Sequence, residues 1–158
     1  ESEPARVWDL FCGVGGFALA LAAPGRRVLG VEVSAPAIDG ARDAAALMGL
    51  DPDLVRFEAG DARVLDPAAD PDGSIPGEVE AERPDLLVVN PPRRGIGEHL
   101  VTRIEASGVE RVLYSSCNPR TLATDLAHLP SMRVVRARLF DMFPHTDHAE
   151  VLVELARG

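Results

Sequence analysis

The chain contains no lysine, so its basic side chains other than histidine are 16 arginines. Two explanations stand side by side. One is a composition bias of the genome, and the other is selection for the planar guanidinium group, which binds phosphate through two parallel hydrogen bonds.

Long apolar runs and a signal-peptide pattern are also missing. No apolar segment approaches the roughly 18 to 20 residues of a membrane helix, and the amino terminus "ESEPARVW" has neither a basic nor an apolar region. With 158 residues, of which 46% are hydrophobic, the chain is long enough to bury one core. We therefore expect a single cytoplasmic domain, residues 1–158, with no membrane contact and no inferred protein partner.

Cysteine is scarce, because Cys12 and Cys117 are the two in the chain. Such a small number fits a reducing compartment better than a disulfide framework. A bridge between Cys12 and Cys117 is the alternative.

The net charge of −9 argues against a surface that binds polyanions on all sides. Six of the acidic residues lie between positions 66 and 82, a stretch with proline, glycine and no base that we expect to be a surface loop. The rest of the chain carries 19 acidic residues against 16 arginines, so it is nearly balanced.

Short apolar runs alternate with alanine-rich segments of helical spacing, which predicts a doubly wound α/β fold with a mostly parallel sheet. Two final strands without a helix between them predict an antiparallel hairpin, because a short connection cannot carry a parallel crossover. This combination is typical of a Rossmann-like class I methyltransferase sheet. The expected strands are Arg6–Phe11, Arg27–Glu32, Val55–Ala59, Asp85–Asn90, Arg111–Ser115, Arg133–Phe140 and Ala149–Leu155, and the expected helices are Gly16–Ala23, Ala35–Met48, Glu98–Ala106 and Pro119–His128.

A glycine turn follows the first strand in "VWDLFCGVGGFALALA". Gly13 and Gly15 would let a ligand approach the backbone closely. The second strand ends at Glu32, an acid placed to bind ribose hydroxyl groups, and Asp61 follows the third strand at the same edge. These positions predict a nucleoside cofactor; the alternatives are a helix cap for Glu32 and a turn-forming role for Asp61.

The fourth strand runs into Asn90, two prolines and two arginines in "LLVVNPPRRGIG". The prolines stiffen the backbone, so that Asn90 can present its amide at a fixed place. A bare Asn-Pro-Pro motif also suggests an amino-methyltransferase, which would carry an aromatic residue where this chain has Arg93.

Cys117 follows the fifth strand in "LYSSCNPRTLATDL", just before a helix that we expect to begin at Pro119. The helix dipole and Arg120 would favour the thiolate, which is the nucleophilic form of cysteine. A small buried hydrophobic residue is the alternative for Cys117. For Cys12, we expect packing.

Four motifs together, "DLFCGVGGFAL", "VNPPRRGIG", "YSSCNPRTLATDL" and "FDMFPHTDHAEVLVEL", resemble the S-adenosylmethionine-dependent RNA uracil-5-methyltransferases from about Val7 to the carboxyl end. The asparagine at the head of "NPPRRGIG" looks most like the branch that acts on 23S ribosomal RNA, the RlmC type. The branch that methylates tRNA is the nearest rival. The amino-terminal RNA-binding barrel, an upstream glutamine and a central insertion of this family have no counterpart here, so we expect a catalytic domain.

The resemblance implies a role for several positions. Cys117 would be the nucleophile that adds to C6 of uracil, and Glu150 would be the base that removes the C5 proton. The cofactor contacts implied for S-adenosylmethionine are Phe11, Glu32, Asp61 and Asn90, and we expect Arg93, Arg94 and Arg120 to contact the RNA.

Other interpretations stay open. Glu150 could be a surface carboxylate paired with Arg136 or Arg138, and Asp147 is a second candidate base. The stretch "HTDHAE" could ligate a metal, although we expect none. An RNA cytosine-5-methyltransferase would carry a second cysteine beside the proline turn, and a cofactor- or RNA-binding module without catalysis is the non-enzymatic alternative.

Overall fold

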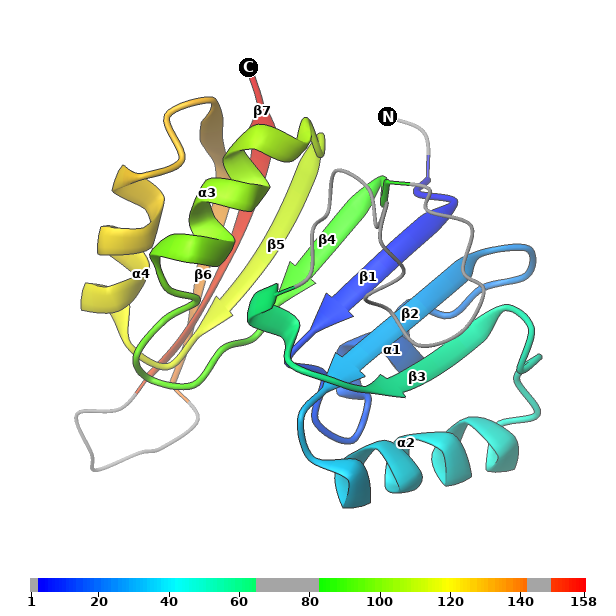
Figure 1. The fold of residues 1–158 in the computed structure, drawn as a ribbon. Coiled ribbons are helices and arrows are strands. Elements are labelled where there is room, and N and C mark those ends of the chain that lie inside the picture. The colour runs from blue at the N-terminus through cyan, green and yellow to red at the C-terminus, as the bar shows by residue number, and fades with distance from the viewer. Residues whose placement is uncertain (1–2, 65–82, 142–148) are drawn as a thin grey trace.

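The computed structural model describes residues 3–64, 83–141 and 149–158. Within these ranges, seven strands form one sheet in the order β3-β2-β1-β4-β5-β7-β6 (Figure 1). The strands are β1 Arg6–Leu10, β2 Arg27–Glu32, β3 Val55–Ala59, β4 Leu86–Val89, β5 Arg111–Ser116, β6 Met132–Phe140 and β7 Glu150–Arg157. The helices are α1 Gly16–Leu21, α2 Ala35–Leu47, α3 Glu98–Ser107 and α4 Pro119–Ala127, with a short 3-10 turn, η1, at Ala62–Val64. The predicted strands and helices are confirmed, and no end is shifted by more than two residues.

The first five strands are parallel, and their carboxyl ends meet at one edge of the sheet. β4 shows why these strands form, because its four residues are apolar and all buried, as expected for a strand covered on both faces. The chain runs outward from β1 through β2 to β3 and then returns to pair β4 with β1. The strand order therefore reverses between β1 and β4, the place where open α/β sheets bind ligands.

β7 inserts antiparallel between β5 and β6, so the predicted antiparallel hairpin is confirmed. Its register pairs Tyr114 with Val153 and Ser116 with Val151. Because β7 begins where β5 ends, the start of β7 lies at the same edge as the carboxyl ends of the parallel strands.

Two cores lie on opposite faces of the sheet. One contains Leu100 of α3, Leu122 of α4 and Tyr114 of β5. The other contains Ala18 of α1 and Ile38 of α2. Figure 1 shows α3 in front of β5 and β7, and α1 behind β1 and β2, so the two pairs of helices cover different halves of the sheet.

Candidate active site

A cavity of about 420 Å³ opens at the carboxyl edge of the sheet, beside the point where the strand order reverses. This volume is in the usual range for small-molecule and cofactor sites. Four residues predicted to contact a cofactor line it together, each just after or at the end of a different parallel strand: Phe11, Glu32, Asp61 and Asn90. The remaining lining residues are Val33, Ala62, Arg63, Pro91, Pro92 and Arg94.

The glycine turn approaches this cavity with an unusual backbone. Phe11 has φ 63°, and it is the one non-glycine residue with positive φ in the described ranges. Such a backbone conformation is costly for a side chain larger than glycine and concentrates at functional sites. Gly15 has φ 85°, and a Cβ atom there would meet the ring of Phe57 at 2.9 Å. The turn thus needs glycine at position 15 for both conformation and space.

Glu32 connects the glycine turn to the start of α2. Its Oε2 accepts a hydrogen bond from the backbone N–H of Gly13 at 3.3 Å, and its Oε1 accepts one from Ser34 at 3.1 Å. Ser34 is the N-cap of α2 but makes no side-chain capping bond. Glu32 therefore fixes the two loops that border the cavity while its carboxylate lines it.

Asp61 forms a two-pronged ion pair with Arg63. The Nε and Nη2 atoms of Arg63 donate to the two carboxylate oxygens at 2.9 and 2.6 Å, and its backbone N–H donates at 3.0 Å. The side-chain hydrogen bond from Arg63 is the main reason why the pKa of Asp61 is lowered. Sequence reasoning missed Arg63, although an arginine two residues after a turn-forming aspartate is a visible signal for such a pair.

Asp9 lies fully buried in β1, directly behind the glycine turn. Its Oδ2 accepts a hydrogen bond from the backbone N–H of Ala18 at 2.9 Å, whereas Oδ1 has no partner in the described part of the chain. Burial raises the pKa of Asp9 to about 7, against the opposing effect of that hydrogen bond. This residue was not singled out from the sequence, because nothing local shows that a strand carboxyl group is buried.

The two cysteines have different environments and form no disulfide, so the alternative of a bridge is wrong. Cys12 is 8% exposed within the core under α1 and α2, which confirms its packing role. Burial, followed by the charges of Asp9 and Glu32, raises its pKa to about 12. Cys117 is partly exposed, so it is not the fully buried hydrophobic residue of the alternative interpretation.

Cys117 lies between the end of β5 and the start of α4, as predicted. Asn118 is the N-cap of α4, and its side chain accepts a hydrogen bond from the backbone N–H of Arg120 at 3.2 Å. The antiparallel register pairs Ser116 with Val151. Because the strands are antiparallel, the residue after Ser116 and the residue before Val151 lie opposite each other, which places Cys117 level with Glu150.

Glu150 begins β7, and its Oε1 accepts a hydrogen bond from the hydroxyl group of Ser115. In the described part of the chain it forms no ion pair with Arg136 or Arg138, so that alternative is wrong. The other candidate base, Asp147, lies outside the described residues. Ser115 is the second residue that sequence reasoning passed over, although "YSSC" places it two residues before the cysteine.

The proline turn and the cysteine turn are held together by direct hydrogen bonds. The carbonyl oxygen of Arg93 accepts one from Asn118 Nδ2 at 3.0 Å and one from the Thr121 hydroxyl group at 3.1 Å. Arg94 lines the cavity, and Arg120 is exposed in the first turn of α4. Of the three arginines predicted to bind RNA, Arg94 therefore lines the cavity, whereas Arg93 and Arg120 lie in the two turns that these hydrogen bonds join.

Asp125, a buried aspartate on α4, holds the loop that follows Asn90 through hydrogen bonds. Asp125 Oδ2 accepts hydrogen bonds from the backbone N–H of Ile96 at 3.0 Å and from the hydroxyl group of Tyr114 at 2.5 Å. Burial and the bond to Asp125 raise the pKa of Tyr114. One carboxyl group therefore links α4, β5 and the loop that follows Asn90.

The described residues do not form a metal site. Three or more histidine, cysteine or acidic side chains do not come together there in a way that could hold a metal ion. His145 and His148, the imidazole groups of the alternative metal interpretation, lie outside these residues. None of the helices described is long and apolar enough to span a membrane.

Comparison with known proteins identifies similar chains. The model of the tRNA (uracil-5-)-methyltransferase family matches residues 2–158. A 23S rRNA (uracil(747)-C(5))-methyltransferase RlmC from Vibrio vulnificus is 48% identical over 157 residues, covering 99% of this chain and 38% of that protein. An RlmC from Shewanella amazonensis is also 48% identical, with the same coverage. This chain therefore spans less than half the length of these curated relatives.

A solved structure of a uracil-5-methyltransferase is similar to almost the whole chain. The tRNA (uracil-54, C5)-methyltransferase of Pyrococcus abyssi, in complex with S-adenosyl-L-homocysteine, superimposes with a TM-score of 0.79. It is 32% identical to this chain and covers 99% of it, and the chain covers 35% of that protein. A magnesium protoporphyrin IX methyltransferase from Synechocystis, at 15% identity and a TM-score of 0.68, shares the fold.

Proposed function

Because the chain belongs to the tRNA (uracil-5-)-methyltransferase family, we propose that it transfers a methyl group from S-adenosylmethionine to C5 of a uridine in RNA. The observation that carries this proposal is that Cys117 follows β5 directly and Glu150 begins β7, each next to the register pair of Ser116 and Val151. The reaction needs a nucleophile that adds to C6 of uracil and a base that later removes the proton from C5, and Cys117 and Glu150 can supply both.

The cavity fits the cofactor chemically. Glu32 offers carboxylate oxygens for a ribose. Asp61, which is paired with Arg63, would face the adenine end of the cofactor. Asn90 and the stiff Pro91 and Pro92 turn form the wall on the side of β4. When bound, S-adenosylmethionine supplies a sulfonium methyl group, which is electrophilic.

Cys117 would begin the reaction. Carbon C5 of uracil is too weakly nucleophilic to take a methyl group unaided, so the Cys117 thiolate adds to C6 and makes C5 electron-rich. C5 then forms a bond to the methyl carbon as the carbon–sulfur bond of the sulfonium breaks. The position of Cys117 just before α4, with Asn118 as cap, supports this role through the positive end of the helix dipole.

Glu150 would finish it. Removing the C5 proton regenerates the C5–C6 double bond and expels the Cys117 thiolate, and the proton passes to the carboxylate of Glu150. The hydrogen bond from Ser115 supports this role because it fixes one carboxylate oxygen and leaves the other for the substrate. A stacked uridine cannot enter such a site, so the target base must lie in a loop or be flipped out.

The RNA that we favour is 23S ribosomal RNA, which would place the reaction in the cytoplasm. Curated RlmC relatives reach 48% identity, whereas the tRNA-modifying structure is 32% identical. A tRNA is the second candidate. Arg93, Arg94 and Arg120 would contact the RNA, because they lie in the turn after Asn90 and in the first turn of α4, next to Cys117, and arginine pairs well with phosphate.

Nucleoside analysis tests this proposal. The chain, S-[methyl-³H]-adenosylmethionine and 23S ribosomal RNA or tRNA are incubated, and the digested RNA is separated by chromatography. Label in 5-methyluridine from 23S ribosomal RNA is the expected result. Glu32→Ala should abolish this label, because it weakens the binding of the cofactor. Label in another nucleoside, or in none although cofactor binds, would refute the proposal, and label from tRNA alone would select the second candidate.

A further inference from the structure

The edge strand β6 has two unlike faces. Along its pairing with β7, Val134 lies opposite Leu155 and Ala137 opposite Val153, both of which belong to the core under α3 and α4. Paired residues of an antiparallel ladder project to the same face. Val134 and Ala137 therefore share the face of α3 and α4.

The arginines of β6 lie on the other face. Arg133 pairs with Ala156, Arg136 with Glu154 and Arg138 with Leu152, each one position away from the core-facing residues. A register shift between Val134 and Arg136 keeps all three arginines on one side. All three are exposed, and within the described part of the chain none of their guanidinium groups forms an ion pair.

This face of β5, β7 and β6 is basic in a chain whose net charge is −9. The acid opposite Arg136 is Glu154, and it is already paired with Arg111 at 3.1 Å. Helices α1 and α2 pack on the same face of the sheet but over β1, β2 and β3. Among the described elements, β6 and β7 therefore carry no helix on this side.

The row of arginines leads to the catalytic end of the sheet. β6 runs toward the edge where Phe140 pairs with Glu150. Phe140 is 40% exposed, so an aromatic ring is presented to solvent beside the candidate base. A base can stack on such a ring, and arginines at alternate positions of a strand match a nucleic-acid backbone.

We infer that Arg133, Arg136 and Arg138 form a track for the phosphates of the RNA strand next to the target uridine, and that Phe140 stacks a base beside Glu150. The inference rests on the proposed function, because it assigns the track to the same RNA. Charge complementarity selects RNA over an apolar partner, since three of the exposed side chains of β6 on this face are arginines that form no ion pair in the described part of the chain.

Salt-dependent binding tests this track. A fluorescein-labelled ribosomal RNA hairpin is titrated with the chain at several salt concentrations, and the slope of log Kd against log salt is measured. Arg136→Gln with Arg138→Gln should reduce the slope by about 1.4, since each lost contact to a single-stranded phosphate removes roughly 0.7. The Phe140→Leu variant should weaken binding with an unchanged slope, because it removes stacking and no charge.

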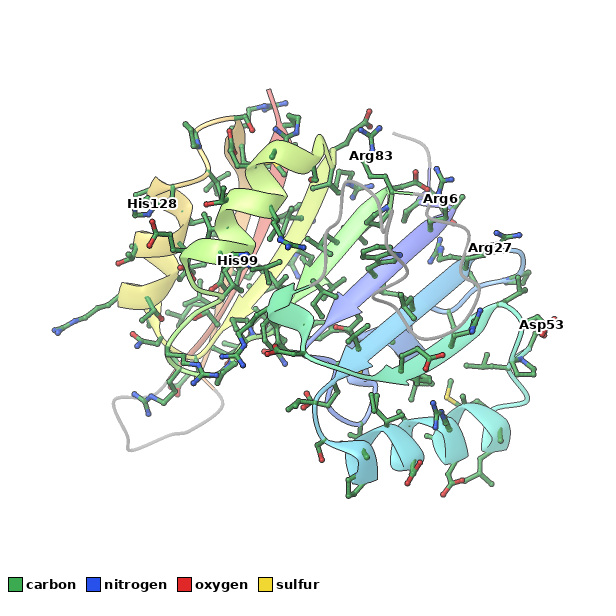
Figure 2. The ribbon with its side chains drawn as sticks, in the orientation of Figure 1. Arg6, Arg27, Asp53, Arg83, His99 and His128 are labelled. Carbon is green, nitrogen blue, oxygen red and sulfur yellow. The ribbon has the colours of Figure 1, made fainter. Side chains whose placement is uncertain are left out.

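A matched control removes the same charge elsewhere. Arg27→Gln with Arg56→Gln changes β2 and β3 at the opposite edge of the sheet, and Figure 2 shows Arg27 far from α3 and α4. The control should keep the wild-type slope. Equal slopes for both double variants, or absence of RNA binding by the wild type, would overturn the track. Methylation by the wild type, assayed separately, reports on the proposed function whatever the slopes show.

Discussion

The hydroxyl group of Ser115 donates a hydrogen bond to Oε1 of Glu150 across the β5–β7 ladder. Ser115 is 3% exposed, so this bond is shielded from competing water. It sets the direction of a carboxylate that stands one register step from Val151 and level with Cys117. Ser115 is thus a positioning residue for the candidate base.

Replacing Ser115 with alanine should separate two steps of the reaction. Methyl transfer in a single turnover should stay near the wild-type rate, because Cys117 is untouched. Multiple turnover should slow by about tenfold or more, since a hydrogen bond to a charged group is worth about 1.5 to 3 kcal/mol. Rapid-quench and steady-state assays measure the two rates. Thr124→Ala, which removes an exposed hydroxyl group of α4, is the control and should change neither; equal slowing of both rates in Ser115→Ala would contradict a role in proton removal.

Asp125 should be one of the costliest residues to remove. Asp125→Ala leaves the Ile96 N–H and the Tyr114 hydroxyl group buried without their partner, at about 1 to 3 kcal/mol for each group. Tyr114→Phe should cost less, because Asp125 keeps its bond to Ile96. Urea denaturation measures the free energies of unfolding of both single variants and of the double variant.

The exposed Asp53, which lies in the loop before β3 (Figure 2), provides the comparison. Asp53→Ala should change stability by less than about 0.5 kcal/mol. A similarly small loss for Asp125→Ala would show that the links among α4, β5 and the Ile96 loop do not stabilise the fold.

Asp9 should make stability fall as pH rises. Its folded-state pKa is raised to about 7 from an ordinary value of 3.8, so the folded chain holds this proton more tightly than the unfolded chain does. The stabilising contribution is complete below about pH 4 and is lost as pH rises through about 7, at a cost of up to about 4 kcal/mol. Asp9→Asn removes the titrating group, so its stability should vary less between pH 4 and 8 than that of the wild type.

Asp85, whose pKa is shifted in the opposite direction, serves as the control for that experiment. Burial would raise the pKa of Asp85, but hydrogen bonds from Arg6 and Ala5 and the charge of Arg6 outweigh it and lower the pKa overall. Its contribution is present at neutral pH and is lost as pH falls below its ordinary range. Asp85→Asn should therefore leave the loss between pH 4 and 8 in place, and an Asp9→Asn curve that overlays the wild type would disprove the assignment to Asp9.

Much of the fold was predictable from local pattern. Strands such as β4 are uninterrupted apolar runs, and Pro119 after Asn118 marks the start of α4 in the letters themselves. The convergence of Glu32, Asp61 and Asn90 followed from the rule that parallel strands end at one edge. Each of these signals is contained in a few consecutive residues, which is why a single sequence reveals it.

What escaped prediction depends on distant pairs. The bond between Asp125 and Ile96 joins residues 29 positions apart, and that between Ser115 and Glu150 joins residues 35 apart. The register of β7 against β5 decides the second pair, and a shift of one residue would have turned Glu150 to the other face. The burial of Asp9 likewise depends on helix α1 packing over β1.

The most direct measurement is a denaturing gel of the chain incubated with S-adenosylmethionine and 23S ribosomal RNA containing 5-fluorouridine. Fluorine at C5 prevents the final proton removal, so a covalent protein–RNA complex should accumulate. A retarded band that requires the cofactor, persists in Cys12→Ala and disappears in Cys117→Ala is the predicted result. A band that survives in Cys117→Ala, or the absence of any band while 5-methyluridine forms on ordinary RNA, would contradict the mechanism through Cys117.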